Sequence, residues 1–157
     1  MAALREATEE FLAGKRIAVA GVSRSSGQAA NLVYRRLRDR GYTVFAVNPN
    51  AETVEGDRCY SDLRSIPDGV DGVVVATTPS VAEGVVAECA ELGIRRVWLH
   101  RSFGTGSVSE TAVDYGREHG LQVIAGGCPC MFGKTADPGH RLMRGILGLT
   151  RGLPKDV

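Results

Sequence analysis

Residues 17–27 read Ile17-Ala18-Val19-Ala20-Gly21-Val22-Ser23-Arg24-Ser25-Ser26-Gly27. A short apolar run is followed there by a glycine-serine turn and then by a segment with helical periodicity. Glycine allows a tight turn and a close approach of the backbone to a ligand, while the free N–H groups of the following helix attract an anion. The stretch therefore predicts a buried strand, a phosphate-binding turn and a helix. A plain tight connection is the alternative, because the spacing departs from G-x-G-x-x-G and the Lys-Ser or Lys-Thr pair of a Walker A loop does not follow Gly27.

Similar elements alternate along the whole chain. Apolar runs rich in β-branched residues lie at 17–20, 44–47, 73–76, 97–99 and 123–125, and segments with helical spacing separate them. This alternation is typical of an α/β fold with a parallel sheet and crossover helices. We expect one doubly wound, mainly parallel sheet of five strands in a single domain covering residues 1–157. Its core would span about residues 14–132, with an extra N-terminal helix and a C-terminal helical extension at about 137–152.

Capping signals place the starts of three helices. Ser80 with Glu83, and Ser107 with Glu110, have the spacing of a capping box, in which a hydroxyl and a carboxylate satisfy free amide groups. Asp137-Pro138 is typical of an N-cap followed by the first residue of a helix. The apolar side chains of this last helix share one face, formed by Leu142, Met143, Ile146 and Leu149. Exposed apolar faces on the two terminal helices would be compatible with a homodimer.

The loops differ between the two edges of the predicted sheet. Helix-to-strand joints such as Arg40-Gly41 are short, whereas polar, Gly- or Pro-containing loops follow every strand, at residues 21–27, 48–50, 77–79, 100–106 and 126–133. In open α/β sheets the ligand crevice lies outside the carboxyl ends of the strands, where strand order reverses. We expect the crevice between the first and fourth predicted strands, at 17–20 and 97–99.

The end of the second predicted strand narrows the ligand. NAD-binding folds usually carry an Asp or Glu there, which binds the adenosine ribose hydroxyl. This chain has Asn48-Pro49-Asn50 instead. A carboxylate would repel a nucleotide with a phosphate on its adenosine ribose, so its absence favours such a nucleotide, and Arg24 and Arg101 could supply charge for that phosphate.

Composition excludes several classes of partner. The 157 residues carry a net charge of +1 with both signs interspersed, so we expect binding neither to nucleic acid nor to a membrane. Charged residues near the N-terminus do not fit a secretory signal peptide. Four irregularly spaced cysteines do not form a disulfide framework, and a reducing, cytoplasmic location is expected.

With these residues in view, the chain resembles the small cytoplasmic CoA-binding proteins. Their Rossmann-like domain is similar to the CoA-binding domain of the succinyl-CoA synthetase alpha subunit. The resemblance covers about residues 10–132 and rests on five motifs in order: Gly21-Val22-Ser23, Gly41-Tyr42 leading into Val47-Asn48-Pro49, Gly56 to Tyr60, Val97-Trp98-Leu99, and Cys128-Pro129. It implies coenzyme A or an acyl-CoA as the ligand.

The resemblance also implies a site, residue by residue. The pyrophosphate would be held by Gly21, Val22, Ser23, Arg24, Ser25, Ser26 and Gly27. Asn48, Pro49 and Asn50 would flank the adenosine and its ribose phosphate. Thr77, Thr78 and Pro79 would line the adenine or pantetheine side, and His100 and Arg101 would face the pantetheine arm.

Two departures limit the activity that the resemblance implies. Gly126-Gly127 stands where related chains usually carry an Asp-Arg pair before Cys-Pro, so the chemistry of this loop differs. The chain also lacks a counterpart of the synthetase's catalytic half, and ligase activity of the isolated chain is not expected. No complete nucleophile-base-acid set is visible. A non-catalytic carrier, sensor or thiol-protecting role is therefore the leading hypothesis.

Several side chains leave alternatives open. Cys128 and Cys130 are either a redox pair that could form a mixed disulfide with CoA or, as we favour, small residues in a tight turn. A C-x-C pair without further ligands at suitable spacing is a poor zinc signal, so no metal is expected. His100 at a strand end could serve as an acid or base in an NADP-dependent or other nucleotide-dependent enzyme, whereas His140 fits a structural role in the last helix.

Overall fold

The computed structural model describes residues 2–102, 104–133 and 137–149. Its helices are α1 (Ala2–Ala13), α2 (Ala29–Asp39), α3 (Pro79–Leu92), α4 (Glu110–Glu118) and α5 (Pro138–Leu149), with a 3-10 turn η1 at Pro129–Met131. Its strands are β1 (Arg16–Ala20), β2 (Thr43–Val47), β3 (Thr53–Val54), β4 (Asp57–Tyr60), β5 (Gly72–Val75), β6 (Arg96–Leu99) and β7 (Gln122–Ala125). Residues 150–152 of the expected C-terminal extension lie outside the described residues, as does residue 103 of the loop after β6.

The α/β fold is confirmed, and its sheet is larger than expected. Seven strands lie in the order β3-β4-β2-β1-β5-β6-β7, and all pairs are parallel except β3 with β4. The five predicted strands are all present, but the predicted count missed β3 and β4. These two form a short hairpin, and β4 reads Asp-Arg-Cys-Tyr, which gives no apolar run to detect.

The point of strand reversal also differs from the prediction. Strand β1 pairs with β2 on one side and with β5, the third predicted strand, on the other. It does not pair with β6, which is the fourth predicted strand. Because β4 adds a parallel strand beside β2, the parallel strands follow the doubly wound order 3-2-1-4-5-6 when counted along the chain. The crevice expected beside β6 therefore belongs between β1 and β5.

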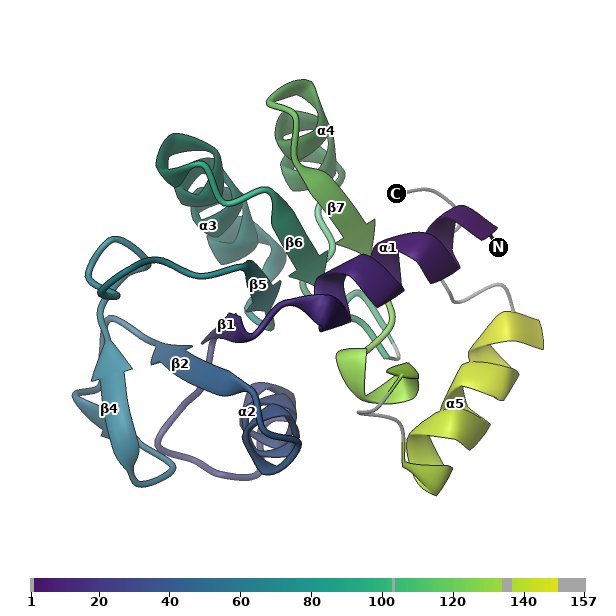
Figure 1. The fold of residues 1–157 in the computed structure, drawn as a ribbon, viewed down its shortest axis with the longest axis horizontal. Coiled ribbons are helices and arrows are strands. Elements are labelled where there is room, and N and C mark those ends of the chain that lie inside the picture. The colour runs from purple at the N-terminus through teal and green to yellow at the C-terminus, as the bar shows by residue number, and fades with distance from the viewer. Residues whose placement is uncertain (1, 103, 134–136, 150–157) are drawn as a thin grey trace.

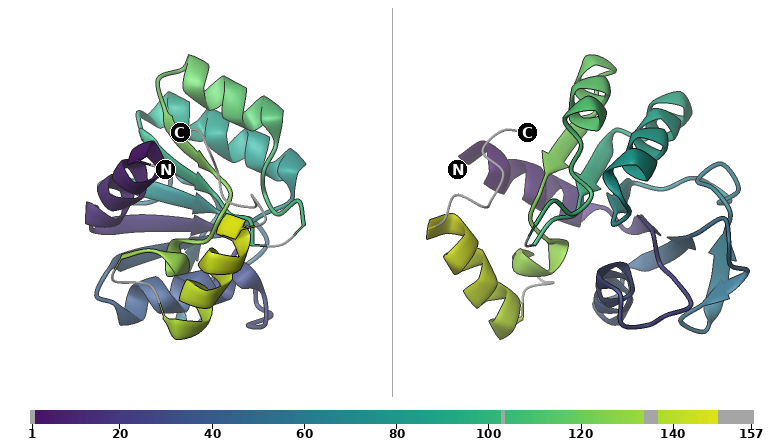
Figure 2. Two further views of the ribbon diagram at one scale, coloured as in Figure 1. Left: turned by 90° about the vertical axis from the view of Figure 1, so that its right-hand side faces the viewer. Right: turned by 180° about the vertical axis from the view of Figure 1, so that it is seen from behind.

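Helices cover both faces of the sheet (Figures 1 and 2), and alternating side chains on the strands divide the core into two layers. Ile17, Val19, Val74, Trp98 and Ile124 face α1, α2, η1 and α5. The intervening strand residues, such as Ala18, Val73 and Val97, pack against α3 and α4. Both faces of the sheet are covered, as parallel sheets require.

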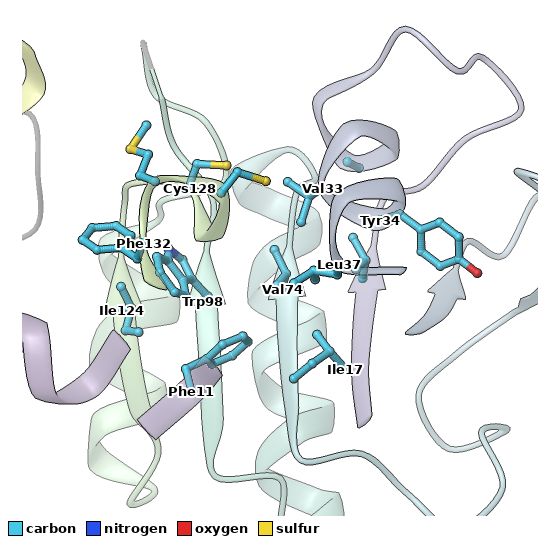
Figure 3. Close-up of a cluster of buried hydrophobic side chains, with 14 of the residues drawn as sticks. Phe11, Ile17, Val33, Tyr34, Leu37, Val74, Trp98, Ile124, Cys128 and Phe132 are labelled. Carbon is cyan, nitrogen blue, oxygen red and sulfur yellow. The ribbon is translucent and has the colours of Figure 1, made fainter. Parts of the chain in front are cut away.

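Trp98 lies at the centre of the core layer on the side of the sheet that α1 and α2 cover (Figure 3). Its ring packs edge-on against Phe11 at a centroid distance of 5.4 Å and lies 5.5 Å from Phe132. The indole Nε1 donates a 2.9 Å hydrogen bond to the carbonyl oxygen of Gly126. This bond satisfies the buried N–H group and fixes the turn after β7 against the sheet.

The β3–β4 hairpin is fastened to α2. The Tyr34 hydroxyl donates a 2.8 Å hydrogen bond to Asp57, and the Arg38 guanidinium donates one of 2.7 Å to the same carboxylate oxygen. These two bonds hold the pKa of Asp57 below its ordinary value. Glu55 and Gly56 form the hairpin turn with φ of 51° and 79°, as a type I′ turn requires.

The first residues of α3, α4 and α5 test the three capping predictions, of which two are wrong and one is confirmed. α3 follows Thr78 with Pro79 in its first turn, and α4 is capped by Ser109, whose hydroxyl accepts a hydrogen bond from the Ala112 amide. The capping boxes assigned to Ser80 and Ser107 are therefore wrong, since proline starts α3 early and the Ser107 hydroxyl has a distant partner. Asp137 caps α5 as expected, accepting a hydrogen bond from the amide of His140.

α5 turns part of its apolar surface outward. Leu142, Ile146 and Leu149 are 67%, 44% and 88% exposed, whereas Leu147 is buried and Met143 packs partly against the core. The predicted apolar face is thus mostly solvent-facing, and Leu147 supplies the main contact. Among the described residues, no helix has the length and apolar character needed to cross a membrane.

Candidate ligand-binding site

A cavity of about 480 Å³ opens at the carboxyl edge of the sheet. It lies where strand order reverses, because its lining includes the residues that follow β1, β5 and β6. The N-terminal part of α2, Cys128 after β7 and two residues of α5 complete the wall. The lining consists of Gly21, Gln28, Ala29, Ala30, Leu32, Val33, Ala76, Thr77, His100, Ser102, Gly106, Ser107, Cys128, His140 and Met143. A volume of this size is typical of small-molecule and cofactor sites.

Gly21 is required by the backbone at the end of β1. Its φ is +102°, and a Cβ atom at this position would lie 2.2 Å from the carbonyl oxygen of Ala76. The backbone segments after β1 and β5 therefore approach each other more closely than any residue except glycine at position 21 would permit. Gly27 differs, since a Cβ there would meet no atom within 4 Å. Only the first glycine of the predicted turn is sterically necessary.

Asn31, a buried residue of α2, holds the turn at residues 21–28 by hydrogen bonds. The buried Asn31 amide oxygen accepts a 3.0 Å hydrogen bond from the Ser23 N–H, and its Nδ2 donates to the Ser23 carbonyl at 2.7 Å and to Glu55 at 2.8 Å. Arg35 donates to the Ser26 carbonyl at 2.9 Å and to Glu55 at 2.8 Å. The hydrogen bond from Asn31, followed by that from Arg35, lowers the pKa of Glu55. We call Asn31, Arg35 and Glu55 the clamp.

The clamp presents the turn to solvent. Arg24, Ser25, Ser26 and Gly27 are exposed. Gln28, the N-cap of α2, makes no side-chain capping bond, and the first turn of α2 carries no acidic residue. Because Gln28, Ala29 and Ala30 line the cavity, the positive end of the helix dipole faces it.

The expected nucleotide loop after β2 has a structural role. The Asn48 side chain donates to the Val22 carbonyl at 3.0 Å and accepts from the Asn50 amide at 2.9 Å. It thus ties the loops after β1 and β2 together. Pro49 and Asn50 are exposed beside this junction, and none of the three lines the cavity. Val22 of the predicted site is buried and packs in the core.

The opposite wall depends on Ser107. Its hydroxyl accepts a 2.8 Å hydrogen bond from the Thr77 amide and donates one of 2.7 Å to the Thr77 carbonyl. The Ser107 amide donates to the His100 carbonyl, and a Cβ on neighbouring Gly106 would lie 2.4 Å from that carbonyl oxygen. The loops after β5 and β6 are therefore joined at the cavity. Thr78 and Pro79 begin α3 and do not line it.

His100 is 8% exposed at the end of β6. Burial, with a smaller contribution from the nearby charge of His140, lowers the pKa of His100 to about 4. The ring is therefore neutral at pH 7, and its Nε2 lies 3.5 Å from the Ser102 hydroxyl. Arg101 pairs through its backbone with Gly127, and its guanidinium packs over Gly126 instead of lining the cavity.

Cys128, Cys130 and His140 meet at the α5 side of the cavity. Cys128 and His140 line it, while Cys130 is fully buried in η1. Figure 3 shows Cys128 in the same cluster of buried side chains as Trp98 and Val33. One ligand atom from each of the three residues lies within 4.8 Å of the others. A hydrogen bond between the two thiols raises the pKa of Cys128 and lowers that of Cys130.

Of the predicted site residues, Gly21, Thr77, His100 and Cys128 come together around the cavity. Sequence reasoning missed Gln28, Ser107 and the clamp, and it left His140 as a structural residue. The Glu-Gly pair at 55–56 was a weak hairpin signal, and Asp137-Pro138 already placed His140 in the first turn of α5. The partner of Ser107 is 30 residues away, which no local pattern reveals.

Comparison with known proteins gives one family. A family model described as a CoA binding domain matches residues 15–134. The ADP-forming acetate–CoA ligase II of Archaeoglobus fulgidus is 30% identical over 119 residues, covering 70% of this chain and 18% of the ligase. The uncharacterized protein YneT of Bacillus subtilis is 30% identical over 123 residues, covering 78% of this chain and 88% of YneT.

A solved structure has the same architecture. A hypothetical protein from Pyrococcus horikoshii OT3 superposes with a TM-score of 0.73 and 30% identity, over 80% of this chain and 86% of that protein. The chain spans less than a fifth of the ligase that it matches, at 18% of its length.

Proposed function

This chain belongs to the CoA binding domain family, and we propose that it binds coenzyme A or an acyl-CoA in the cavity at the carboxyl edge of its sheet. Family membership supports the class of ligand. The cavity supports its place, because it connects an exposed, anion-attracting turn to a buried, mostly apolar interior.

The phosphates belong at the turn of residues 21–28. The clamp fixes this turn without covering it, and the uncapped start of α2 directs its amides to the same point. Exposed Arg24 is the cation for the ribose 3′-phosphate of CoA. The loop of Asn48, Pro49 and Asn50 holds no carboxylate that would repel this phosphate. The arrangement of turn, helix start and cavity is the single observation that carries the proposal.

The pantetheine arm enters the cavity between α2 and the loop after β5. Ala30, Val33 and Ala76 supply apolar contacts. The Thr77 hydroxyl, which donates to the Thr78 carbonyl at 3.0 Å, is an acceptor for an amide of the arm. The thiol end then lies towards His100 and Cys128. A buried, neutral imidazole suits a hydrogen bond to a thiol or thioester better than it suits a charge.

We propose a non-catalytic carrier, sensor or thiol-protecting role. Among residues 2–102, 104–133 and 137–149, His100 has no carboxylate partner that would complete a nucleophile-base-acid set. The four cysteines are free thiols and fit a reducing, cytoplasmic setting. The ligase reaction of the longer relatives is not part of the proposal.

Native mass spectrometry of the gently purified protein tests the ligand. We expect a retained CoA-sized adduct, or selective binding of added CoA over NADP and ATP in separate titrations. Preferential binding of NADP would favour a nucleotide-dependent enzyme that uses His100. No CoA binding at millimolar concentration would reject the proposal.

A further inference from the structure

Two thiols and one imidazole converge from segments that are separate in sequence. Cys128 and Cys130 flank Pro129 at η1, and His140 arrives from the first turn of α5, which packs against η1. Their ligand atoms lie within 4.8 Å of one another. A tetrahedral zinc ion with bonds of about 2.0–2.3 Å holds its ligand atoms about 3.5–3.8 Å apart. Closing the cluster onto an ion thus needs any two ligand atoms to approach each other by about 1.0–1.3 Å at most, within the reach of side-chain rotation.

Asp137 orients the imidazole for such a role. Its Oδ2 lies 2.7 Å from His140 Nδ1, while its Oδ1 accepts from the His140 amide. With Nδ1 bound to the carboxylate, Nε2 is the nitrogen that remains for a metal. A carboxylate on the second nitrogen is the usual support of a zinc-binding histidine, because it fixes the tautomer and increases ligand basicity. This contact is independent of the thiol pair.

The charge balance is favourable for a divalent cation. Two thiolates and the Asp137 carboxylate would carry three negative charges. Arg36, which lies 3.7 Å from Asp137, and Arg40, whose charge acts on Cys130, offset part of that charge. The thiols release their protons to solvent as they bind the metal. Access is available because Cys128 and His140 form part of the cavity wall.

We propose that Cys128, Cys130 and His140 form a zinc site whose fourth coordination position opens into the cavity. Thiolate and imidazole ligands select zinc over harder cations such as magnesium or calcium. Three protein ligands and one open position are typical of a zinc ion that contacts an exogenous ligand. Asp137 is a positioning residue, and Cys130 is the ligand that lies fully buried. Among the described residues, no other group of three such side chains has this spacing.

Titration of the reduced, metal-free chain with Zn²⁺ and Co²⁺, in the absence of CoA, tests the site. We expect one ion per chain, sulfur-to-cobalt charge-transfer absorption and the intense visible bands of tetrahedral Co²⁺. Cys130→Ser and His140→Ala should abolish these bands. Two control variants should retain the bands: Cys89→Ser, at a buried cysteine of α3, and His119→Ala, at an exposed histidine directly after α4.

Asp137→Asn sharpens the test, because asparagine preserves the helix cap and removes the carboxylate charge. We expect Co²⁺ affinity to fall about 10- to 100-fold with unchanged band positions. If Cys130→Ser disturbs folding, His140→Ala remains as a second variant, because the His140 side chain is partly exposed. Absence of binding by the reduced chain, or bands that persist in both variants, would overturn the zinc site. Because CoA is absent from the titration, either result stands apart from the outcome for CoA binding.

Discussion

The turn after β1 and the turn after β7 border the same cavity but are held in different ways. The turn at 21–28 is exposed and depends on the clamp of Asn31, Arg35 and Glu55. The turn at 126–131 is buried, and its backbone bends through Gly126 and Gly127 at φ of 117° and 73°. The first presents amides towards solvent, which suits an anion, whereas the second presents thiols within the core. The cavity therefore has an anion-attracting end and a soft, apolar end.

The largest expected effect is at Gly21. In Gly21→Ala, the new methyl group would clash with the Ala76 carbonyl in a backbone conformation that alanine disfavours. We expect a loss of at least about 3 kcal/mol in the free energy of unfolding, together with loss of CoA binding. Urea unfolding and CoA titration measure both.

Gly27→Ala is the matched control, because its Cβ would meet no atom within 4 Å. Its stability should stay within about 0.5 kcal/mol of the original chain. Equal losses for the two variants would show that Gly21 is not specially constrained and that the exposed turn moves freely.

The clamp gives the next largest effect. Asn31→Ala leaves the Ser23 amide and carbonyl without their side-chain partner, which should cost about 2–3 kcal/mol of stability. CoA affinity should also fall about tenfold, because binding must then order the turn. Glu55→Gln retains a partner for Asn31 and should lose less in both measurements. A stability loss without any change in CoA affinity would separate the clamp from ligand binding.

The pH dependence of stability tests the buried end of the cavity, at His100. The pKa of His100 in the folded chain is about 4, below the ordinary 6.5, so the unfolded chain binds a proton on this ring at higher pH than the folded chain does. Stability is therefore lost as pH falls, by about 2 kcal/mol between pH 7 and pH 5 from this group alone. The loss should continue to about pH 4.

His100→Gln should remove this part of the pH dependence, as measured by urea unfolding at both pH values. His119→Gln serves as the exposed control and should leave the dependence unchanged. The same pH dependence in His100→Gln and the original chain would contradict a buried, neutral imidazole.

The smallest effect concerns charge at the exposed end. Arg24→Ala should weaken CoA binding about fivefold, a change of about 1 kcal/mol for an exposed ion pair. Binding of dephospho-CoA and pantetheine should change less, since they lack the ribose phosphate. Calorimetry with the three ligands checks this, with Arg117→Ala on α4 as a distant control. Equal losses for all three ligands would reject contact of Arg24 with that phosphate.

The same contrast explains what the sequence could predict. The strands at β1, β2, β5, β6 and β7 were recognisable because burial on both faces requires continuous apolar runs. β4 was missed because a four-residue strand that contains Asp57 and Arg58 lacks that pattern. Its absence from the count displaced the expected reversal point from β5 to β6.

Four of the predicted site residues follow strands and line the cavity: Gly21, Thr77, His100 and Cys128. Their part in ligand binding stays a prediction. The remaining parts arise from pairs distant in sequence. Asn31 with Glu55 and Cys130 with His140 are brought together by packing of α2, the hairpin, η1 and α5, which no local spacing encodes.

A crystal structure of the CoA complex would locate the ligand directly. We expect the pyrophosphate at residues 21–28 and the start of α2, with the pantetheine arm in the cavity and its thiol towards His100 and Cys128. CoA bound at the opposite edge of the sheet, such as the 300 Å³ cavity beside Arg16 and Ile94, would contradict it. So would phosphates placed away from the exposed turn.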